Sequence, residues 1–441
     1  MRSQTPKMPI SITIQTTGDC NLACTYCYQH CKNTKAIDMA HAKKFIDAII
    51  HNDQEFWQGY TDFADCGNII LSFIGGEPLM NYRAVIECCD YYAEQCKKYD
   101  KVDLYNKTIF DIGTNGTIIN KEITDLIDRH KSRMNLSITI DGCEELHDAC
   151  RRFKNTNAPS YQLIVKNMEE FKKHLCPMRP LDNTKITLAP ENIDYLVQST
   201  KNMFETLGFN KVPANCVFEK VWSFPDSIKL YKYLKEIADY FLEKDWDFDS
   251  FDYSGEQGHT PGKQFGFFCA EHFVPETDMQ NSWCGGNGRM LFLQYDGKIY
   301  NCVRYSETSM GNPDRDLYIG HVDTGINMKD NIAFLRSASN ETIMDDECKS
   351  CAVAKGCADC LAYNYEISGT FKKPKALCDM HKARSLANVY FWNKYYIKKG
   401  IDKFFFLHLP LSEAIKYVDE QELEMLLDLS NRRYIKYLQE R

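Results

Sequence analysis

The sequence lacks both a long apolar run and an excess of basic residues. No stretch approaches the roughly 18 apolar residues of a membrane-spanning helix, and the opening MRSQTPKMPISITIQ lacks the apolar core of a secretory signal. Lysine and arginine number 53 against 61 aspartate and glutamate residues, which gives a net charge of −8 and no basic field for nucleic-acid phosphates. We therefore expect a cytoplasmic protein whose partners include neither nucleic acid nor a membrane.

Internal repeats and low-complexity segments are also missing from the 441 residues. A hydrophobic content of 44% is ample for a globular core, and the length suggests two or three domains. The composition is that of a soluble, folded protein.

The chain is rich in cysteine for its length, with 20 residues of this type. A disulfide framework does not suit a reducing cytoplasm, so metal ligation is the better explanation. Three cysteines lie within residues 20–27, and seven more lie between residues 284 and 378. We expect two separate metal-binding regions, and we expect the other cysteines to be core or surface residues.

The first group has the spacing CxxxCxxC, formed by Cys20, Cys24 and Cys27 in GDCNLACTYCYQHC. A four-iron four-sulfur cluster normally takes four thiolates, so three ligands in one loop leave one iron free to bind another molecule. A closed zinc site is the alternative, with Cys31 or His30 as the fourth ligand.

From residue 9 to about residue 220, β-rich runs alternate with helical patterns, which is typical of βα units around a parallel sheet. The predicted strands are 10–15, 69–74, 108–112, 135–140, 185–189 and 215–218. The predicted helices are 39–51, 82–98, 121–129, 161–174, 193–207 and 226–244. Six such units predict an α/β fold, an incomplete (β/α)6 TIM-like barrel that is open on one side. The three-cysteine loop follows the first strand, where pockets in such sheets form.

We divide the chain into a barrel (9–220), a helix and bridging region (221–283), a small metal-held domain (284–383) and a C-terminal helical tail (384–441). The third segment has many cysteines and short apolar runs, so metal is expected to hold it together. The tail contains two amphipathic helical patterns.

Further motifs follow the next three predicted strands: GGEP at 75–78, GTNGT at 113–117, and SITIDG with HDACR at 137–151. With the three-cysteine loop, these motifs resemble the radical S-adenosylmethionine (SAM) enzymes. The resemblance implies that one electron from the cluster cleaves SAM to a 5'-deoxyadenosyl radical, which abstracts hydrogen from a substrate. It also implies a SAM-binding set: Tyr26, Gly75, Gly76, Glu77, Pro78, Thr114, Asn115, Gly116, Thr139 and Arg151. In this set Tyr26 lies against adenine, Glu77 accepts from the ammonium and Arg151 pairs with the carboxylate.

The second cysteine group begins with Cys284, Gly297 and Cys302 and continues with CxxCxxxxxC. It resembles a SPASM domain, the extension that carries two auxiliary four-iron four-sulfur clusters in many peptide-modifying relatives. Two residues separate Cys357 from Cys360, where that family usually has three. The nearer cluster would take Cys284, Cys302 and Cys360, with Cys269 as candidate fourth ligand, and the farther one Cys348, Cys351, Cys357 and Cys378. A pair of zinc ribbons is the alternative.

The stretches LAPENIDYL, NCVFE and GCADCLAYNYEISG more narrowly resemble peptide maturases whose targets carry CxxxC-like repeats. This resemblance implies a ribosomally made, cysteine-rich precursor peptide as substrate, a thioether crosslink as product, and a low-potential electron donor such as flavodoxin or ferredoxin. Only 19 residues precede Cys20, so another surface or a separate leader-binding protein is expected to capture the leader.

Two other functions stay open. Another radical modification is possible in principle: a carbon-carbon crosslink, epimerisation or formylglycine formation. Sulfatase maturases have an aspartate after the second cysteine of the opening SPASM pair, and Val303 at that position makes formylglycine the less favoured product. The non-enzymatic alternative is a zinc-stabilised adaptor that binds a peptide. No general acid or base is identified from the sequence.

Overall fold

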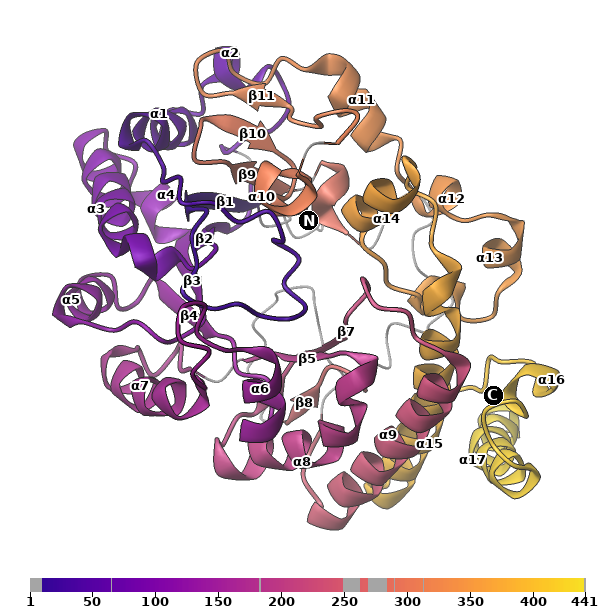
Figure 1. The fold of residues 1–441 in the computed structure, drawn as a ribbon. Coiled ribbons are helices and arrows are strands. Elements are labelled where there is room, and N and C mark those ends of the chain that lie inside the picture. Colours follow the sequence, from indigo (N-terminus) through magenta and orange to yellow (C-terminus); the bar gives the residue numbers. More distant parts are fainter. Residues whose placement is uncertain are drawn as a thin grey trace.

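The computed structural model describes residues 10–64, 66–181, 184–248, 262–268, 284–288, 290–311 and 313–439. Its largest sheet has seven strands in the order β11-β10-β9-β1-β2-β3-β4. Figure 1 shows these strands along one side of a ring, with helices on the outside. The strands are β1 (Ile10–Thr17), β2 (Ile69–Gly75), β3 (Thr108–Thr114), β4 (Met134–Ile138), β9 (Met290–Leu293), β10 (Lys298–Tyr300) and β11 (Gly320–His321).

Strands β1 to β4 pair in parallel, and two shorter parallel pairs continue the ring. These pairs are β5 (Ile186–Leu188) with β7 (Ala214–Cys216), and β6 (Lys211–Val212) with β8 (Gln264–Phe265). The six predicted strands correspond to β1 to β5 and β7, so the prediction of a partial α/β barrel is confirmed.

Alternate residues of the parallel strands face opposite sides of the sheet. Leu71, Phe110 and Leu136 belong to the buried set that packs under the outer helices. The opposite, inner face carries polar residues, and Asp111 accepts hydrogen bonds there from Ser72 at 3.0 Å and Asn135 at 2.5 Å. Burial raises the pKa of Asp111. This face is mixed in polarity, because Ile70, Ile74 and Ile109 alternate onto the same side as Ser72 and Asp111.

The helices between the strands begin at residues that cap them. Asp38 accepts from the amide of Ala40 before α1, and Ser223 forms a capping box with Asp226 at the start of α9. The helices are α1 (Met39–Ile50), α2 (Gln54–Trp57), α3 (Tyr82–Lys98), α4 (Val102–Asn106), α5 (Lys121–Arg129), α6 (Glu144–Cys150), α7 (Tyr161–His174), α8 (Leu196–Lys201) and α9 (Phe224–Lys244). The predicted helix 193–207 is divided into a 3-10 turn, α8 and one π turn.

Strands β9 to β11 were not among the predicted strands. β9 pairs in parallel with β1, from Ser11 with Met290 to Ile14 with Leu293, and β10 and β11 then add antiparallel strands. These three strands lie after the predicted boundary at 283/284, yet they belong to the same sheet as β1 to β4. The domain boundaries themselves stay a prediction.

The cysteine-rich segment contains short helices, and two longer helices lie near the end of the chain. They are α10 (Glu307–Met310), α11 (Lys329–Arg336), α12 (Asn340–Ile343), α13 (Asp346–Ser350), α14 (Leu361–Ser368), α15 (Cys378–Lys398), α16 (Leu411–Ala414) and α17 (Glu420–Gln439). Helix α15 packs against both α9 and α17, and Figure 1 shows it beside α9. Among the described residues, no helix has the length and apolar character needed to cross a bilayer.

Candidate cluster and cofactor site

Cys20, Cys24 and Cys27 lie in the loop after β1, at the carboxyl end of the parallel strands. Backbone bonds fix this loop: the amide of Ala23 donates to the Arg152 carbonyl at 2.9 Å, and that of Thr25 to the Cys150 carbonyl at 3.0 Å. The amide of Leu22 donates to the Cys20 sulfur at 3.4 Å. The end of α6 thus holds the loop in place.

Two cations face these thiols. The Arg151 guanidinium donates from Nη1 to the Cys24 sulfur at 3.7 Å. Burial lowers the pKa of Lys32, but the charges of Cys27, Cys20 and Cys24 outweigh it and the net shift is upward. Burial also raises the pKa of Cys20 to about 11, with Lys32 acting in the opposite direction. Three thiols in one loop with two cations beside them suit a metal cluster, because its thiolate ligands carry negative charge.

The two residues considered as a fourth zinc ligand point elsewhere. The Cys31 sulfur lies near Gly311, 3.2 Å from where a Cβ of that residue would stand, and the Cys31 amide donates to the Thr308 carbonyl. His30 pairs through Nε2 with Glu366 at 3.3 Å. Neither contact favours a closed four-ligand site in this loop. The ligand roles of the three cysteines stay a prediction.

Tyr26, Asp141 and Arg151 form one polar cluster beside the loop. Arg151 donates from Nε to Asp141 at 2.6 Å and to the Tyr26 hydroxyl at 2.7 Å, and the Tyr26 hydroxyl also contacts Asp141. The fully buried Asp141 accepts from the amide of Thr187 at 3.0 Å. Arg151 therefore lies beside the cysteine loop as predicted, with its charge already matched by Asp141.

The GGEP turn touches the cysteine loop directly. A Cβ on Gly76 would come within 2.3 Å of the Asp19 carbonyl oxygen and 2.8 Å of the Cys20 Cβ. Only glycine allows this approach. Gly75 is similarly close to Thr17, at 2.6 Å from its carbonyl oxygen, and Pro78 begins a 3-10 turn.

Glu77 is buried, and its two oxygens have partners within the chain. Oε1 accepts from the Leu79 amide at 3.0 Å and from Thr114 at 2.7 Å, while Oε2 accepts from the Asn115 amide at 2.7 Å. These bonds tie the turn after β2 to the end of β3. Acceptance from the SAM ammonium stays a prediction.

The remaining predicted SAM-binding residues lie at the ends of β3 and β4. Asn115 donates to Asn21 of the cysteine loop at 2.8 Å, Gly116 has a φ of +75°, and the Thr139 amide donates to the Thr114 carbonyl at 3.0 Å. The structure thus gathers the predicted set at one rim of the barrel.

The nearer auxiliary set is also brought together. Burial raises the pKa of Cys284 to about 12, and the adjacent Cys302 and Cys360 raise it further. Burial raises the pKa of Cys302 to about 11. Cys269 lies outside the described residues.

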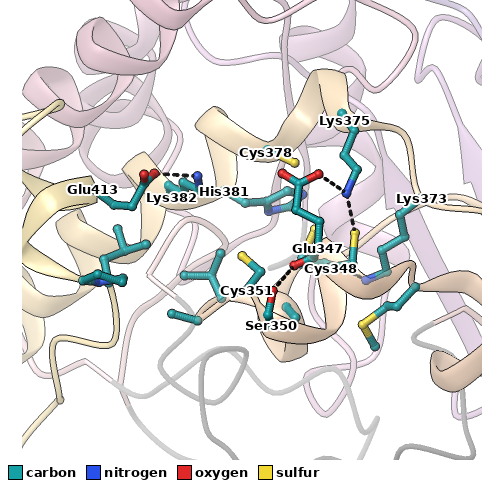
Figure 2. Close-up of a pocket in the computed structure, with 17 residues that line it drawn as sticks. Glu347, Cys348, Ser350, Cys351, Lys373, Lys375, Cys378, His381, Lys382 and Glu413 are labelled. Atoms are coloured by element: carbon teal, nitrogen blue, oxygen red, sulfur yellow. Dashed lines mark hydrogen bonds and ion pairs between the residues drawn. The ribbon is translucent and has the colours of Figure 1, made fainter.

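The farther auxiliary set lines one cavity of about 250 Å³. Figure 2 shows Cys348, Cys351 and Cys378 around it, and Cys357 also lines it. Lys375 donates to the Cys348 sulfur at 3.2 Å and pairs with Asp345 at 2.9 Å. Burial raises the pKa of Cys357 to about 12. Four thiols with adjacent lysines fit a metal centre of net negative charge.

Arg304 connects the two cysteine regions. It donates from Nη1 to the Tyr28 carbonyl at 3.2 Å, next to Cys27, and from Nη2 to Glu219 at 3.1 Å and Glu366 at 3.3 Å. Its side chain is 8% exposed, and its charge lowers the pKa of Cys360 against the larger effect of burial. Arg304 and Glu219 thus form a salt bridge.

Two lysines that lie near the site belong to none of the sequence motifs. Lys32 is five residues beyond Cys27, and Lys185 shares one face of the β5–β7 pair with Thr187 and Asn215. Lys185 donates to the Asn215 side-chain oxygen at 3.0 Å when that amide donates to the Ala214 carbonyl. The pKa of Lys185 is lowered, because the effect of burial exceeds the opposing effects of Asp141 and Glu219. The alternation of the predicted strand was the signal that could have found Lys185.

The sequence comparisons identify the domain around the first cysteine loop. Residues 14–195 match the family model of the radical SAM superfamily. An uncharacterized protein of Methanocaldococcus jannaschii is 29% identical over 42% of this chain and 58% of its own length. The antilisterial bacteriocin subtilosin biosynthesis protein AlbA of Bacillus subtilis is 28% identical over 36% of this chain and 30% of its own. The cysteine-type anaerobic sulfatase-maturating enzyme of Clostridium perfringens is 23% identical over 79% and 88%.

Solved structures share the fold. The native anSMEcpe with bound AdoMet and Cp18Cys peptide superposes with a TM-score of 0.62 at 18% identity, covering 89% of this chain and 99% of that one. Streptococcus suis SuiB bound to precursor peptide SuiA has a TM-score of 0.53 at 12% identity, covering 84% and 76%. These likenesses confirm the expected α/β fold with its C-terminal helical region.

Proposed function

We propose that this chain, whose residues 14–195 match the radical SAM superfamily, modifies a ribosomally made, cysteine-rich precursor peptide by installing a thioether crosslink. AlbA is named for bacteriocin biosynthesis, and SuiB was solved with a precursor peptide. One observation carries the proposal: two further groups of thiols, at Cys302 and around the Figure 2 cavity, share the chain with the three-cysteine loop.

Cys20, Cys24 and Cys27 would hold a four-iron four-sulfur cluster whose open iron binds SAM, and the other two groups would hold two auxiliary clusters. When bound, the cluster and SAM supply the radical that removes hydrogen from the peptide. Tyr26, Thr114, Asn115, Gly116, Thr139 and Arg151 would contact SAM. The Gly75–Pro78 turn packs against the cysteine loop.

The side chains of this protein would position the peptide and manage charge. Polar groups on the inner face of the barrel, such as Asp111 and Lys185, would form hydrogen bonds with a peptide. Arg304 joins the Tyr28 carbonyl, next to Cys27, to Glu366. The peptide would lie between the SAM position and the nearer auxiliary cluster. A low-potential donor such as flavodoxin or ferredoxin would supply the electron, and a separate leader-binding protein would deliver the peptide.

Anaerobic reconstitution followed by incubation with SAM, a reductant and a cysteine-rich peptide encoded beside the gene tests this function. Three clusters predict about twelve irons per chain. A thioether predicts a loss of about two mass units per link, with consumption of one thiol, because two hydrogens leave the peptide. Unchanged mass with deuterium uptake from heavy water would instead indicate epimerisation. A mass loss with all thiols retained would indicate a carbon-carbon link, and bound zinc without iron would indicate the adaptor.

A further inference from the structure

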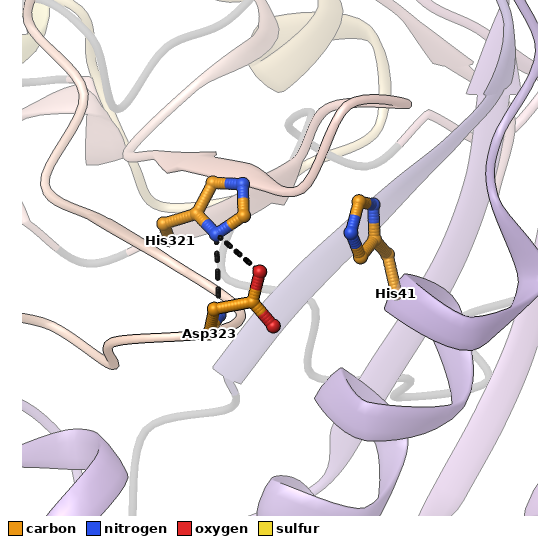
Figure 3. Close-up of side chains that lie close together, drawn as sticks. All are labelled: His41, His321 and Asp323. Carbon is orange, nitrogen blue, oxygen red and sulfur yellow. Dashed lines mark hydrogen bonds and ion pairs between the residues drawn. The ribbon is translucent and has the colours of Figure 1, made fainter.

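Three side chains suited to a transition metal meet outside the cysteine-rich regions. His41 lies on α1, His321 ends β11, and Asp323 lies in the turn after it. Figure 3 shows the Asp323 carboxylate between the two imidazole rings. One ligand atom from each residue lies within 4.8 Å of the others.

We propose that His41, His321 and Asp323 bind one divalent transition metal ion, of which zinc is the best match. Imidazole nitrogen and carboxylate oxygen are ordinary zinc ligands, each about 2.0–2.2 Å from the ion, so two ligand atoms of a tetrahedral site lie about 3.3 Å apart. His321 Nδ1 and Asp323 Oδ2 are 3.4 Å apart. Binding would require the His41 nitrogen to move closer, because the three ligand atoms lie within 4.8 Å of one another and ligand atoms of one ion lie about 3.3 Å apart.

The hydrogen bonds of His321 orient it for this role. Nε2 lies 3.1 Å from the Asp296 carbonyl oxygen, and a carbonyl only accepts, so the neutral ring carries its proton on Nε2. Nδ1 then accepts a hydrogen bond from the Asp323 amide at 3.2 Å and lies 3.4 Å from Oδ2 of the Asp323 carboxylate. A metal ion between Nδ1 and Oδ2 would replace the amide as the partner of the Nδ1 lone pair. A backbone carbonyl behind a ligating imidazole is the usual outer support of a metal site.

The surroundings of His41 and Asp323 also leave a ligand atom available to the metal. His41 Nδ1 is buried and has no hydrogen-bond partner among the described residues, and its ring lies edge-on to His321 with centroids 5.5 Å apart. Lys44, one turn after His41, pairs with Asp323 Oδ1 at 2.9 Å. The two carboxylate oxygens therefore have different surroundings, and Oδ2 is the one available to the metal.

The site would fasten an edge of the sheet. β11 is the terminal strand and contributes two residues, Gly320 and His321, to its pairing with β10. A metal shared with α1 would hold this edge against the helix that covers the first strands. β10 ends two residues before Cys302, so the same ion would steady the segment that leads to the nearer auxiliary set. Three protein ligands leave a fourth position for water.

The test uses the full-length, anaerobically reconstituted protein, zinc sulfate and a competing chromophoric chelator. The wild type, His41→Ala, His321→Gln and the matched control His51→Ala, which changes the histidine after the same helix, are compared. Bound zinc is measured by mass spectrometry after desalting, and the melting temperature is measured with and without zinc. The wild type and His51→Ala should bind one more zinc than the two variants and should gain melting temperature from it. The two variants should bind zinc at least 10-fold more weakly.

The Lys44→Met variant tests whether the loss of a neighbouring residue affects zinc binding as much as the loss of a ligand. It should keep zinc binding within about 3-fold of the wild type, because Lys44 supports the carboxylate without binding the ion. Equal zinc content and equal melting temperatures in the wild type, His41→Ala and His321→Gln would overturn the proposal. A loss in Lys44→Met as large as that in His41→Ala would overturn the ligand assignment.

Discussion

At the scale of single residues, two glycines near the ends of neighbouring strands have opposite surroundings. Gly76 touches the Asp19 backbone and Cys20, whereas a Cβ on Gly113 would meet nothing within 4 Å. Gly76→Ala should therefore displace the cysteine loop, reduce the iron bound per chain and lower the free energy of unfolding by about 2 kcal/mol. Iron analysis and denaturant titration measure both effects. Gly113→Ala is the control and should match the wild type; equal behaviour of the two variants would contradict the contact argument.

Arg304 is a buried cation shared by two carboxylates. Arg304→Gln should destabilise the fold by about 3 kcal/mol, because Glu219 and Glu366 lose their common partner in a partly buried place. Urea unfolding of the reconstituted protein measures the change. Arg129→Gln removes a more exposed pair with Asp90 and should cost less than about 1 kcal/mol. A loss below that of Arg129→Gln would show that Arg304 does not hold these loops.

His147 gives the fold a pH dependence. It is fully buried, accepts from the Asp141 amide at 3.1 Å through Nδ1, and has a pKa lowered to about 3, first by burial and then by Arg151. The unfolded chain binds a proton near pH 6.5 and the folded chain does not, so stability is full above that pH and is lost as the pH falls toward 3. The free energy of unfolding should fall by about 2 kcal/mol between pH 6 and pH 4.5. Denaturant titrations across this range should show a shallower slope for His147→Gln; an unchanged slope would assign the effect elsewhere.

The predictable residues were those with fixed spacing. The cysteines, the GGEP turn and Arg151 follow recognisable patterns, and the structure gathers them at one rim of the barrel. Lys32 and Lys185 have no such pattern, because their approach to the site depends on loop and strand geometry that a linear spacing does not contain. Likewise, Glu77 accepts hydrogen bonds from Thr114 and Asn115 at the end of β3, about 40 residues away.

At the scale of elements, α15 is stabilised by aromatic packing around most of its surface. Phe391 stacks on Phe268 with centroids 4.3 Å apart and also contacts Phe248 at 5.4 Å. Phe391→Ala should lower the free energy of unfolding by about 4 kcal/mol, because it leaves a cavity among rings. Ile397→Ala, on the exposed part of the same helix, should change it by less than about 0.5 kcal/mol. Chemical denaturation compares the two, and similar losses would contradict this packing.

The helices and first strands were predictable because each carries its own period and cap. β9 to β11 were not, because β9 has four residues and its stability comes from pairing with β1 rather than from its own pattern. A repeating strand–helix pattern does not predict the β9–β10 hairpin, in which β9 pairs with β1. The first helical pattern predicted in the tail corresponds to α15, but this helix begins earlier, at Cys378 within the cysteine pattern.

At the scale of the whole molecule, metal removal should act unevenly. Helix α13 has no buried residue, and α12 and α13 are a single turn each. Removing iron with a chelator should therefore increase amide hydrogen exchange across residues 340–378 well before it affects β1 to β4, whose buried side chains supply their own stability. Exchange measured by mass spectrometry on the reconstituted and chelated protein tests this. Equal protection of residues 340–378 in both forms would mean that metal does not hold this segment.

The parallel pairing of β1 with β9 has a consequence for synthesis on the ribosome. The first strand emerges early, yet its second neighbour is translated some 280 residues later. Until then one flank of the nascent sheet offers unsatisfied amides and carbonyls to any other extended chain. Fragments that end before residue 290 should keep that flank unpaired and precipitate, so an isolated barrel of this protein must include the β9–β10 hairpin.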